Sequence, residues 1–219
     1  MSASPFDDFV LLILNCEKFR NKAQQQKQTW LCDAGFKYFH IIGKEDLDSD
    51  YKFDYEEKIL WVKAPDDYIS LPKKTMSALY AFRKTFPQCK YVFKTDDNQM
   101  LKISKKADSF FQMIRSIIAS KTPKVHYAGY IVDVKTPYLS KYHLVHPELP
   151  ENLPIYATKY CSGPFYILSM EAICCLLLKR KQIEAEYFED YAVGLHLGGP
   201  FKETILNIDS SSFFSEDNT

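Results

Sequence analysis

Continuous apolar runs that alternate with helix-like patterns constrain the fold of this 219-residue chain more than any other feature. The first run occupies residues 10–14, and further strand-like runs occupy residues 36–43, 58–64 and 90–95. A strand that is apolar at every position is typical of a parallel sheet covered on both faces, because neither face meets water. The alternation predicts an α/β fold with a mainly parallel central sheet and helices on both faces.

Helix-like segments separate these runs. Residues 21–31 are polar and tolerate a helix, whereas a second helix is expected to begin at Ser70, with Pro72 in its first turn. A third helix is expected to follow Ser104, because apolar residues there recur at helical spacing. That stripe consists of Ala107, Phe110, Phe111, Ile114, Ile117 and Ile118.

The second half of the chain has a less regular pattern. Residues 125–134 resemble a strand, and residues 136–154 carry prolines and histidines typical of a loop. Residues 159–169 are expected to form a short strand pair broken at Gly163 and the proline after it, and Ser169 is expected to cap another helix. The second half is therefore expected to extend the same sheet and to close one side of a cleft.

Charge and cysteine content exclude several classes of protein. Lys plus Arg equals Asp plus Glu, 28 each, so net charge does not favour nucleic acid as a partner. The spacing of the six cysteines matches no zinc motif, and buried free thiols are expected. The apolar run 9–14 is too short to span a bilayer and follows two aspartates, which is a poor signal peptide. A soluble, cytoplasmic protein without a transmembrane segment is the expectation.

Two adjacent aspartates, Asp96 and Asp97, follow the predicted strand 90–95 and precede Asn98. Such a pair can end a strand as a solvated turn, cap the next helix, or bind a divalent cation. The carboxyl end of a central strand in an α/β sheet is where ligands bind, which favours the third role. Mg²⁺ and Mn²⁺ prefer oxygen ligands and often leave positions open for substrate phosphates.

A second acidic pair, Glu189 and Asp190, precedes a short helix pattern that ends at two glycines. An aspartate at this point can simply cap the helix. A carboxylate held at a helix N-terminus and directed into a cleft can also serve as a general base. The residue pattern alone leaves both roles open.

Four stretches occur in a defined order: "DDYISLPKKTMSALYAF", "PQCKYVFKTDDNQML", "YCSGPFYILS" and "FEDYAVGLHLG". Between residues 22 and 198, this series resembles the beta-1,3-galactosyltransferase-like family, which includes beta-1,3-N-acetylglucosaminyltransferases and Fringe-type enzymes. The resemblance implies a single GT-A domain over residues 1–219, with a nucleotide-sugar-binding half (1–103) and an acceptor-side half (104–208). Residues 209–219 are expected to form a tail.

The resemblance also implies an activity: transfer of a hexose-type sugar, galactose among the candidates, from a UDP-sugar to a glycan or glycoconjugate hydroxyl, with inversion and Mn²⁺ or Mg²⁺. The implied base is Asp190, and the implied metal ligands are Asp97 and Asn98. Donor-binding positions carried over from the family are Lys22, Lys27, Lys74, Lys94, Asp96 and Asp97. Acceptor-side positions are Ser162, Gly163, Tyr166 and Glu189.

Two departures from the family pattern concern the metal. Asn98 stands where the family usually has an aspartate that binds the metal directly, and an amide oxygen carries no charge, so weaker metal binding is expected. The family's late metal-binding histidine has no counterpart, because no histidine follows His196. His196 lies six residues after Asp190, about 240° around a helix, and the two are not expected to share a site.

These departures leave alternatives to a metal-dependent transferase. One is a catalytically weakened or inactive nucleotide- or carbohydrate-binding module of the same fold. Another is an enzyme in which lysines alone hold the diphosphate. His143 and His146 have a spacing that could bind a metal, but a loop that contacts acceptor or solvent is favoured, and His40 and His126 are expected to be structural.

Overall fold

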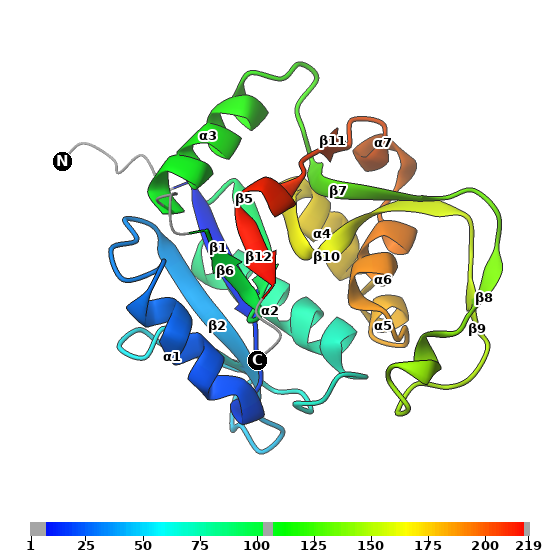
Figure 1. Cartoon of the computed structure of the whole chain (residues 1–219), viewed down its shortest axis with the longest axis horizontal. Coiled ribbons are helices and arrows are strands. Elements are labelled where there is room, and N and C mark those ends of the chain that lie inside the picture. The colour runs from blue at the N-terminus through cyan, green and yellow to red at the C-terminus, as the bar shows by residue number, and fades with distance from the viewer. Residues whose placement is uncertain (1–7, 103–106, 217–219) are drawn as a thin grey trace.

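The computed structural model describes residues 8–102 and 107–216, which form a central sheet of eight strands (Figure 1). The strand order is β11-β7-β10-β5-β1-β2-β4-β3. Neighbours pair in parallel from β5 through β1 and β2 to β4, and also between β11 and β7, whereas β10 is antiparallel to both of its neighbours. The strands are β1 (Phe9–Leu14), β2 (Lys37–Gly43), β3 (Tyr51–Asp54), β4 (Ile59–Val62), β5 (Tyr91–Asp96), β7 (Tyr127–Val134), β10 (Thr158–Ser169) and β11 (Leu206–Asn207).

Strand β1 lies between β2 and β5, and all six of its residues are buried. Its side chains alternate between two hydrophobic clusters, with Val10 and Leu12 on one face and Leu11 and Ile13 on the other. Both faces of the strand are therefore covered, which explains why its sequence is apolar throughout. The predicted α/β architecture with a mainly parallel sheet is confirmed.

Helices cover both faces of the sheet (Figure 1). On one face lie α1 (Arg20–Gln28) and α3 (Ala107–Ala119); the apolar residues of α3, together with Trp30 and Leu31 just after α1, pack in the cluster around Leu11. On the other face the cluster around Val10 includes residues from four helices. These are α2 (Leu71–Thr85), α4 (Met170–Leu178), α5 (Arg180–Ile183) and α6 (Glu189–His196). Two further short helices are α7 (Gly199–Lys202) and η1 (Glu17–Phe19).

The expected helix starts can be compared with the structure. Ser169 caps α4, because its side chain accepts a hydrogen bond from the Ala172 N–H at 3.2 Å. Ser70 precedes α2, which has Pro72 in its first turn, but the Ser70 side chain makes no capping bond. Ser104, which was expected to precede α3, lies outside the described residues.

Residues 159–169 were expected to form a strand pair, but they belong to one long strand, β10. The pairing of β10 with β7 changes register between Cys161 and Tyr166. This irregularity absorbs Gly163 and Pro164, because a bulged segment does not require the N–H that proline lacks. The carbonyl of Pro164 still accepts a bond from the Thr95 hydroxyl at 2.8 Å.

The segment 136–154, expected to be a loop, contains a small hairpin that extends beyond the main sheet (Figure 1). Strand β8 (Tyr138–Ser140) pairs with β9 (Leu153–Ile155), and the 3₁₀ helix η2 (Tyr142–Leu144) lies between them. Strand β9 pairs only with β8 among the described residues, so Pro154 occupies an edge where no N–H is needed. We call residues 138–155 the arm.

The tail expected over residues 209–219 is structured as far as the structure describes it. The 3₁₀ helix η3 (Ser210–Ser212) leads into β12 (Phe214–Glu216), which pairs with β6 (Gln99–Leu101). Phe214 is buried and its ring meets the edge of Trp30 at 5.5 Å between centroids. An apolar anchor therefore holds a polar and acidic segment in place, and residues 217–219 lie outside the described residues.

Across the described ranges 8–102 and 107–216, no helix combines the length and apolar character needed to cross a membrane.

Candidate active site

A cavity of about 640 Å³ opens at the carboxyl ends of β1 and β5. In an open α/β sheet, this is the edge at which ligands bind. The cavity contains the predicted residues Asp96, Asp97, Asn98 and Lys74. We call it the strand-end cavity, and its remaining lining residues are Leu14, Asn15, Cys16, Lys18, Phe19, Asp66, Asp67, Tyr68, Leu71, His146 and Glu148.

Strand pairing fixes one side of the turn that carries Asp96, Asp97 and Asn98, which we call the acidic turn. Asp96 is the last residue of β5 and lies opposite Leu14 of β1. The N–H of Asp97 donates to the Leu14 carbonyl at 3.0 Å, which extends the ladder by one residue. The turn at Asp97 and Asn98 therefore begins directly on the central strand pair of the sheet.

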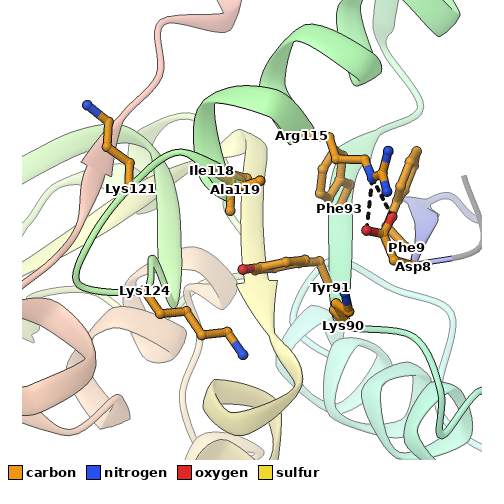
Figure 2. A pocket seen from close by; sticks show the side chains of 10 residues that line it. All are labelled: Asp8, Phe9, Lys90, Tyr91, Phe93, Arg115, Ile118, Ala119, Lys121 and Lys124. Atoms are coloured by element: carbon orange, nitrogen blue, oxygen red, sulfur yellow. Dashed lines mark hydrogen bonds and ion pairs between the residues drawn. The ribbon is translucent and has the colours of Figure 1, made fainter. Parts of the chain in front are cut away.

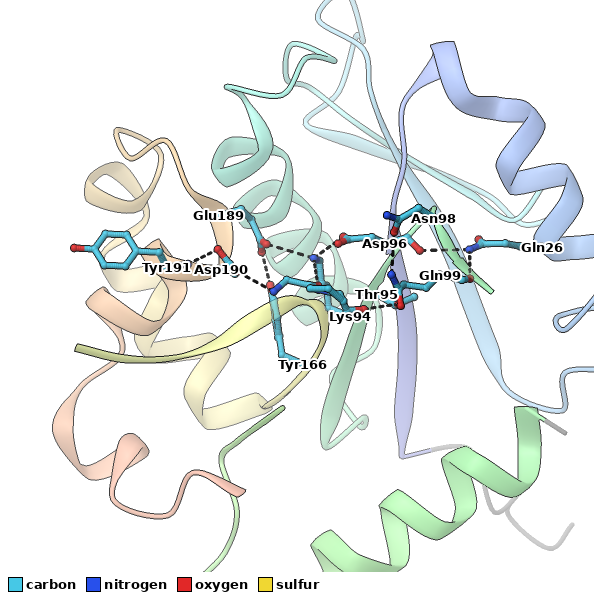
Figure 3. Close-up of polar contacts among 12 residues, drawn as sticks. Gln26, Lys94, Thr95, Asp96, Asn98, Gln99, Tyr166, Glu189, Asp190 and Tyr191 are labelled. Atoms are coloured by element: carbon cyan, nitrogen blue, oxygen red, sulfur yellow. Dashed lines mark hydrogen bonds and ion pairs between the residues drawn. The ribbon is translucent and has the colours of Figure 1, made fainter. Parts of the chain in front are cut away.

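The buried side chain of Gln26, from α1, fixes the same turn from the other side (Figure 3). Its Nε2 group donates to the carbonyls of Gln99 at 2.8 Å and Asp97 at 3.0 Å, and lies 3.3 Å from that of Asp96. Sequence reasoning missed Gln26, because it stands in a run of glutamines with no signal of which one is buried. The turn thus depends on one amide more than 70 residues away in the chain.

Lys94 is a buried cation that connects the two acidic regions (Figure 3). Its Nζ donates to Asp96 Oδ1 and to the Gly163 carbonyl, each at 2.6 Å. It also lies 3.4 Å from Glu189 Oε2, and Glu189 accepts a short hydrogen bond from the Tyr166 hydroxyl. Burial alone would lower the pKa of Lys94, but the charges of Asp96 and Glu189 outweigh burial and raise it. Lys94 therefore stays charged as the counter-ion of two carboxylates.

Lys74, the other predicted donor-binding lysine near the turn, is also buried and paired. Its Nζ donates to the Asn15 carbonyl at 2.5 Å and to Asp66 Oδ1 at 2.6 Å. Asp66 in turn accepts bonds from the N–H groups of Gly43 and Glu17. Lys74 thus supplies positive charge to the wall of the strand-end cavity while holding the loop that carries Asp66.

The two predicted lysines of α1 have different surroundings. Lys22 is half-buried, its Nζ lies 5.1 Å from the centre of the Phe19 ring, and its charge lowers the pKa of Asp97. Lys27 instead lies 3.5 Å from Glu57, and neither lysine is among the residues that line the strand-end cavity. The charge of Lys22 therefore acts on a residue of that cavity, whereas Lys27 lies beside the segment that precedes β4.

Asp97 and Asn98 offer oxygen ligands of the kind that a hard cation prefers. Burial and the nearby charge of Asp96 raise the pKa of Asp97 to about 6, so its ionised form lacks a full counter-charge. The Asn98 amide oxygen already accepts a bond from Gln99 Nε2 at 3.1 Å. No group of three or more His, Cys, Asp or Glu gathers for a metal in the part of the chain that the structure describes. A cation held by these two oxygens would need its remaining ligands from outside the protein.

Asp190 lies in the first turn of α6, with Phe188 as the residue that precedes the helix. Its Oδ2 accepts a bond from the Gly163 N–H at 2.8 Å, and its Oδ1 accepts one from the Tyr191 N–H at 2.7 Å. Burial raises the pKa of Asp190, although the charge of Lys94 and the two N–H bonds oppose this rise. The carboxylate is held in one orientation and binds protons more tightly than a surface aspartate.

Two glycines allow Asp190 and its helix α6 to lie close to β10. An added Cβ at Gly163 would lie 3.5 Å from Asp190 Oδ2 and 3.7 Å from Asp96 Oδ2, so the two carboxylates flank this residue. An added Cβ at Gly194 would lie only 2.2 Å from the Tyr160 Cβ. Gly194 therefore permits α6 to pack directly on β10.

The predicted acceptor-side residues are distributed differently. Tyr166 and Glu189 are buried and bonded to each other, behind the site. Ser162 lines a separate cavity of about 610 Å³, next to the C-terminal strand β12. Gly163 alone among the four lies between the two acidic groups.

Asp190 itself lines a second cavity of about 270 Å³, which adjoins the first because Tyr68 lines both. We call it the aromatic pocket. Its lining residues are Tyr68, Tyr138, Ser140, Tyr142, Ile155, Tyr160, Phe188, Asp190 and Tyr191. Sequence reasoning missed this pocket, because its residues come from five separate segments and form no motif.

The histidines contribute no metal cluster among the described residues. His146 stacks on Tyr68 with ring centroids 4.0 Å apart, and so forms part of the wall of the strand-end cavity. His196 lies 3.0 Å from Glu186 and lines neither the strand-end cavity nor the aromatic pocket. His40 is fully buried, and His126 bonds to the Ser169 hydroxyl.

Another cavity, of about 380 Å³, lies at the opposite, amino ends of β1 and β5 (Figure 2). Arg115 Nε donates to both carboxylate oxygens of Asp8, at 2.7 and 2.8 Å. Lys124 Nζ, also at this cavity, lies 2.6 Å from Glu171. Two of its cations are thus neutralised, and it contains none of the predicted site residues. We therefore place the candidate active site at the carboxyl ends of the strands.

Comparison with known proteins identifies a family and similar folds. The sequence profile of the galactosyltransferase family matches residues 19–199. The fold is similar to the apo structure of the bifunctional glycosyltransferase WbbM, with TM-score 0.50 and 9% identity over 95% of this chain and 40% of that one. A glycosyltransferase involved in the glycosylation of the major capsid of PBCV-1 aligns with TM-score 0.49 and 11% identity, over 92% and 82% of the chains. The search of curated proteins gave no match.

The family match spans most of the chain and includes Asp96, Gly163 and Asp190, which meet at the junction of the two cavities. At 9% identity, the similarity to WbbM shows the fold alone. By its family, the chain is a glycosyltransferase. On the evidence of its sequence profile, it belongs to the galactosyltransferase family.

Proposed function

We propose that the protein is an inverting glycosyltransferase that moves a hexose from a UDP-sugar to a hydroxyl group of a glycan or glycoconjugate acceptor. One observation carries the proposal: the carboxylates of Asp190 and Asp96 flank Gly163. Asp190 lines the aromatic pocket, Asp96 lines the strand-end cavity, and Tyr68 lines both. A donor in the strand-end cavity and an acceptor in the aromatic pocket would meet beside Gly163.

In this proposal, Asp190 removes the proton from the acceptor hydroxyl. The hydroxyl oxygen then bonds to the anomeric carbon, while the bond from that carbon to the diphosphate oxygen breaks on the opposite face. UDP leaves, the anomeric configuration inverts, and Asp190 holds the proton. The raised pKa of Asp190 suits this role, because a stronger base accepts a proton more readily at neutral pH. The two backbone N–H bonds would keep the carboxylate aligned.

The leaving diphosphate needs positive charge near Asp97. We propose that Asp97 and Asn98 hold Mn²⁺ or Mg²⁺ together with the diphosphate of the donor. When bound, the metal would neutralise the charge that develops on the leaving oxygen. Lys22 and Lys74 support this assignment, because their charges already act on Asp97.

The test begins with release of UDP from a set of UDP-hexoses, measured with Mn²⁺ and with a chelator. Asp190→Asn is expected to lower turnover by about 10²–10⁴-fold while UDP binding persists. Asp133→Asn, at a carboxylate on β7 outside both cavities, is the matched control. Wild-type turnover in Asp190→Asn would exclude Asp190 as the base, and turnover that persists in chelator would show that lysines alone suffice.

A second candidate function, a nucleotide- or carbohydrate-binding module with little or no catalysis, has a specific observation in its favour. Asp96 is paired with Lys94, and the Asn98 oxygen accepts a bond from Gln99, so ligands for a metal are few. Asn98→Asp distinguishes the two functions. If the protein is an enzyme with a weakened metal site, this change is expected to tighten Mn²⁺ binding and raise turnover. Absence of turnover in both the wild type and Asn98→Asp would favour the binding module.

A further inference from the structure

The aromatic pocket has a composition that points to a class of ligand. Six of its nine lining residues are aromatic, and they surround the carboxylate of Asp190. The arm contributes Tyr138 and Tyr142, which are 53% and 43% exposed although they line a concave site. These two rings therefore keep faces or edges that no part of the described protein covers.

Contacts among the rings fix the walls of the pocket. Tyr142 meets the edge of Phe188 with centroids 5.8 Å apart, and Tyr160 meets the edge of Tyr191 at the same distance. The Tyr191 hydroxyl accepts a bond from the Tyr156 N–H at 2.7 Å, which ties α6 to the residue directly after the arm. Aromatic pairs in this geometry stabilise one another, so the pocket is largely formed before a ligand arrives.

Size and charge narrow the ligand further. A volume of about 270 Å³ lies below the roughly 300–1,000 Å³ of sites for drug-sized ligands, so the pocket suits one ring rather than an extended chain. Among the described residues that line the pocket, Asp190 is the only charged one, and none is a lysine or an arginine. An anionic ligand would meet a carboxylate with no cation to offset the repulsion.

A pyranose ring matches these features, because it has a face of C–H groups for aromatic contact and a rim of hydroxyl groups. We infer that the aromatic pocket is the acceptor subsite and takes a neutral pyranose unit, which stacks on Tyr138 and presents a hydroxyl to Asp190. This inference rests on the proposed function for the direction of transfer. It also replaces Tyr166 and Glu189, which are buried behind the site, as the residues that contact the acceptor.

The inference can be tested by binding, without turnover. Methyl β-glycosides of neutral hexoses and methyl β-glucuronide are titrated against the full chain in the presence of UDP, and binding is followed by saturation-transfer NMR. At least one neutral glycoside is expected to bind, and the glucuronide at least about tenfold more weakly. Equal binding of the glucuronide, or no binding of any neutral glycoside, would overturn the inference.

Variants at the mouth of the pocket separate stacking from other effects. Tyr138→Ala is expected to weaken glycoside binding roughly five- to tenfold, and Tyr138→Phe, which keeps the ring, to restore it. Tyr55→Ala is the matched control, because Tyr55 is 56% exposed and lies beside Phe39 and Phe53, next to β3 at the opposite edge of the sheet. Unchanged binding in Tyr138→Ala, or an equal loss in Tyr55→Ala, would overturn the assigned contact.

UDP binding by the wild-type protein distinguishes this inference from the proposed function. If UDP binds and UDP-sugars are turned over but no neutral glycoside binds, the acceptor assignment falls and the transferase proposal stands. If a neutral glycoside binds in a Tyr138-dependent manner but no UDP-sugar is turned over, the pyranose site stands and the transferase proposal falls.

Discussion

Gly194→Ala is the substitution that most directly tests how the fold positions Asp190. The new Cβ would lie 2.2 Å from the Tyr160 Cβ and 2.7 Å from its Cα, both on the central strand β10. Ordinary carbon–carbon contact needs about 3.5 Å, so α6 and β10 must separate by roughly 1.3 Å. Asp190 precedes Gly194 by one turn of α6 and therefore moves with it. A shift of this size breaks the 2.8 Å bond between Asp190 and the Gly163 N–H.

Gly194→Ala is expected to lower both the free energy of unfolding and turnover. Overpacking of this kind lowers the free energy of unfolding by about 1–3 kcal/mol, which thermal unfolding measures as a drop of several degrees. If Asp190 is the base, as proposed, its displacement by about 1 Å is expected to lower turnover by roughly 10²-fold in the UDP-release assay. Gly199→Ala is the control, because an added Cβ there has no neighbour within 4 Å. Wild-type turnover and melting temperature in Gly194→Ala would refute the reasoning.

Two further predictions concern buried polar groups. Gln26→Leu removes the amide that donates to three carbonyls of the acidic turn, and is expected to lower the free energy of unfolding by about 2–4 kcal/mol and to weaken Mn²⁺ binding. Denaturant titration and metal titration check this, and an equal effect of Gln24→Leu, at an exposed position on α1, would contradict it. His40 is fully buried, with neither ring nitrogen hydrogen-bonded, and burial lowers its pKa to about 3. Because the unfolded state binds the proton and the native state does not, stability is expected to fall as pH drops from about 6.5 toward 3, by up to about 1.4 kcal/mol per pH unit. Denaturant titrations at several pH values should show a shallower fall for His40→Phe, and an unchanged slope would show that other groups dominate.

The parts of the fold that the sequence predicted are those whose signal is local. The apolar run of β1 and the stripe of α3 each report burial directly, because their own residues face the core. The family resemblance implied separate roles for Asp96 and Asp190, and the rule that ligands bind at strand ends placed Asp96 in a site. Their actual relation, with Gly163 between them, needed the structure.

Other features could not be predicted because they depend on distant partners. Gln26 resembles its exposed neighbours in sequence, and only the return of β5 and β6 beneath α1 gives its amide three carbonyls. Strand β12 looked like a polar tail, since its pairing with β6 spans more than 100 residues. Lys94 was predicted to bind the donor, but its buried pairing with Glu189 could not be predicted, because the two residues are far apart in the chain.

Gly163 has a consequence for how the strand-end cavity and the aromatic pocket influence each other. Its N–H donates to Asp190, and its carbonyl accepts from Lys94, so a single residue is in contact with both the base and the cation beside the acidic turn. A ligand that draws Lys94 away from this carbonyl also changes the proton affinity of Asp190. By thermodynamic reciprocity, protonation of Asp190 changes the affinity for that ligand by the same factor. Asp190 and Lys94 are therefore linked through one residue of β10, and we expect a ligand that moves Lys94 to change the protonation of Asp190.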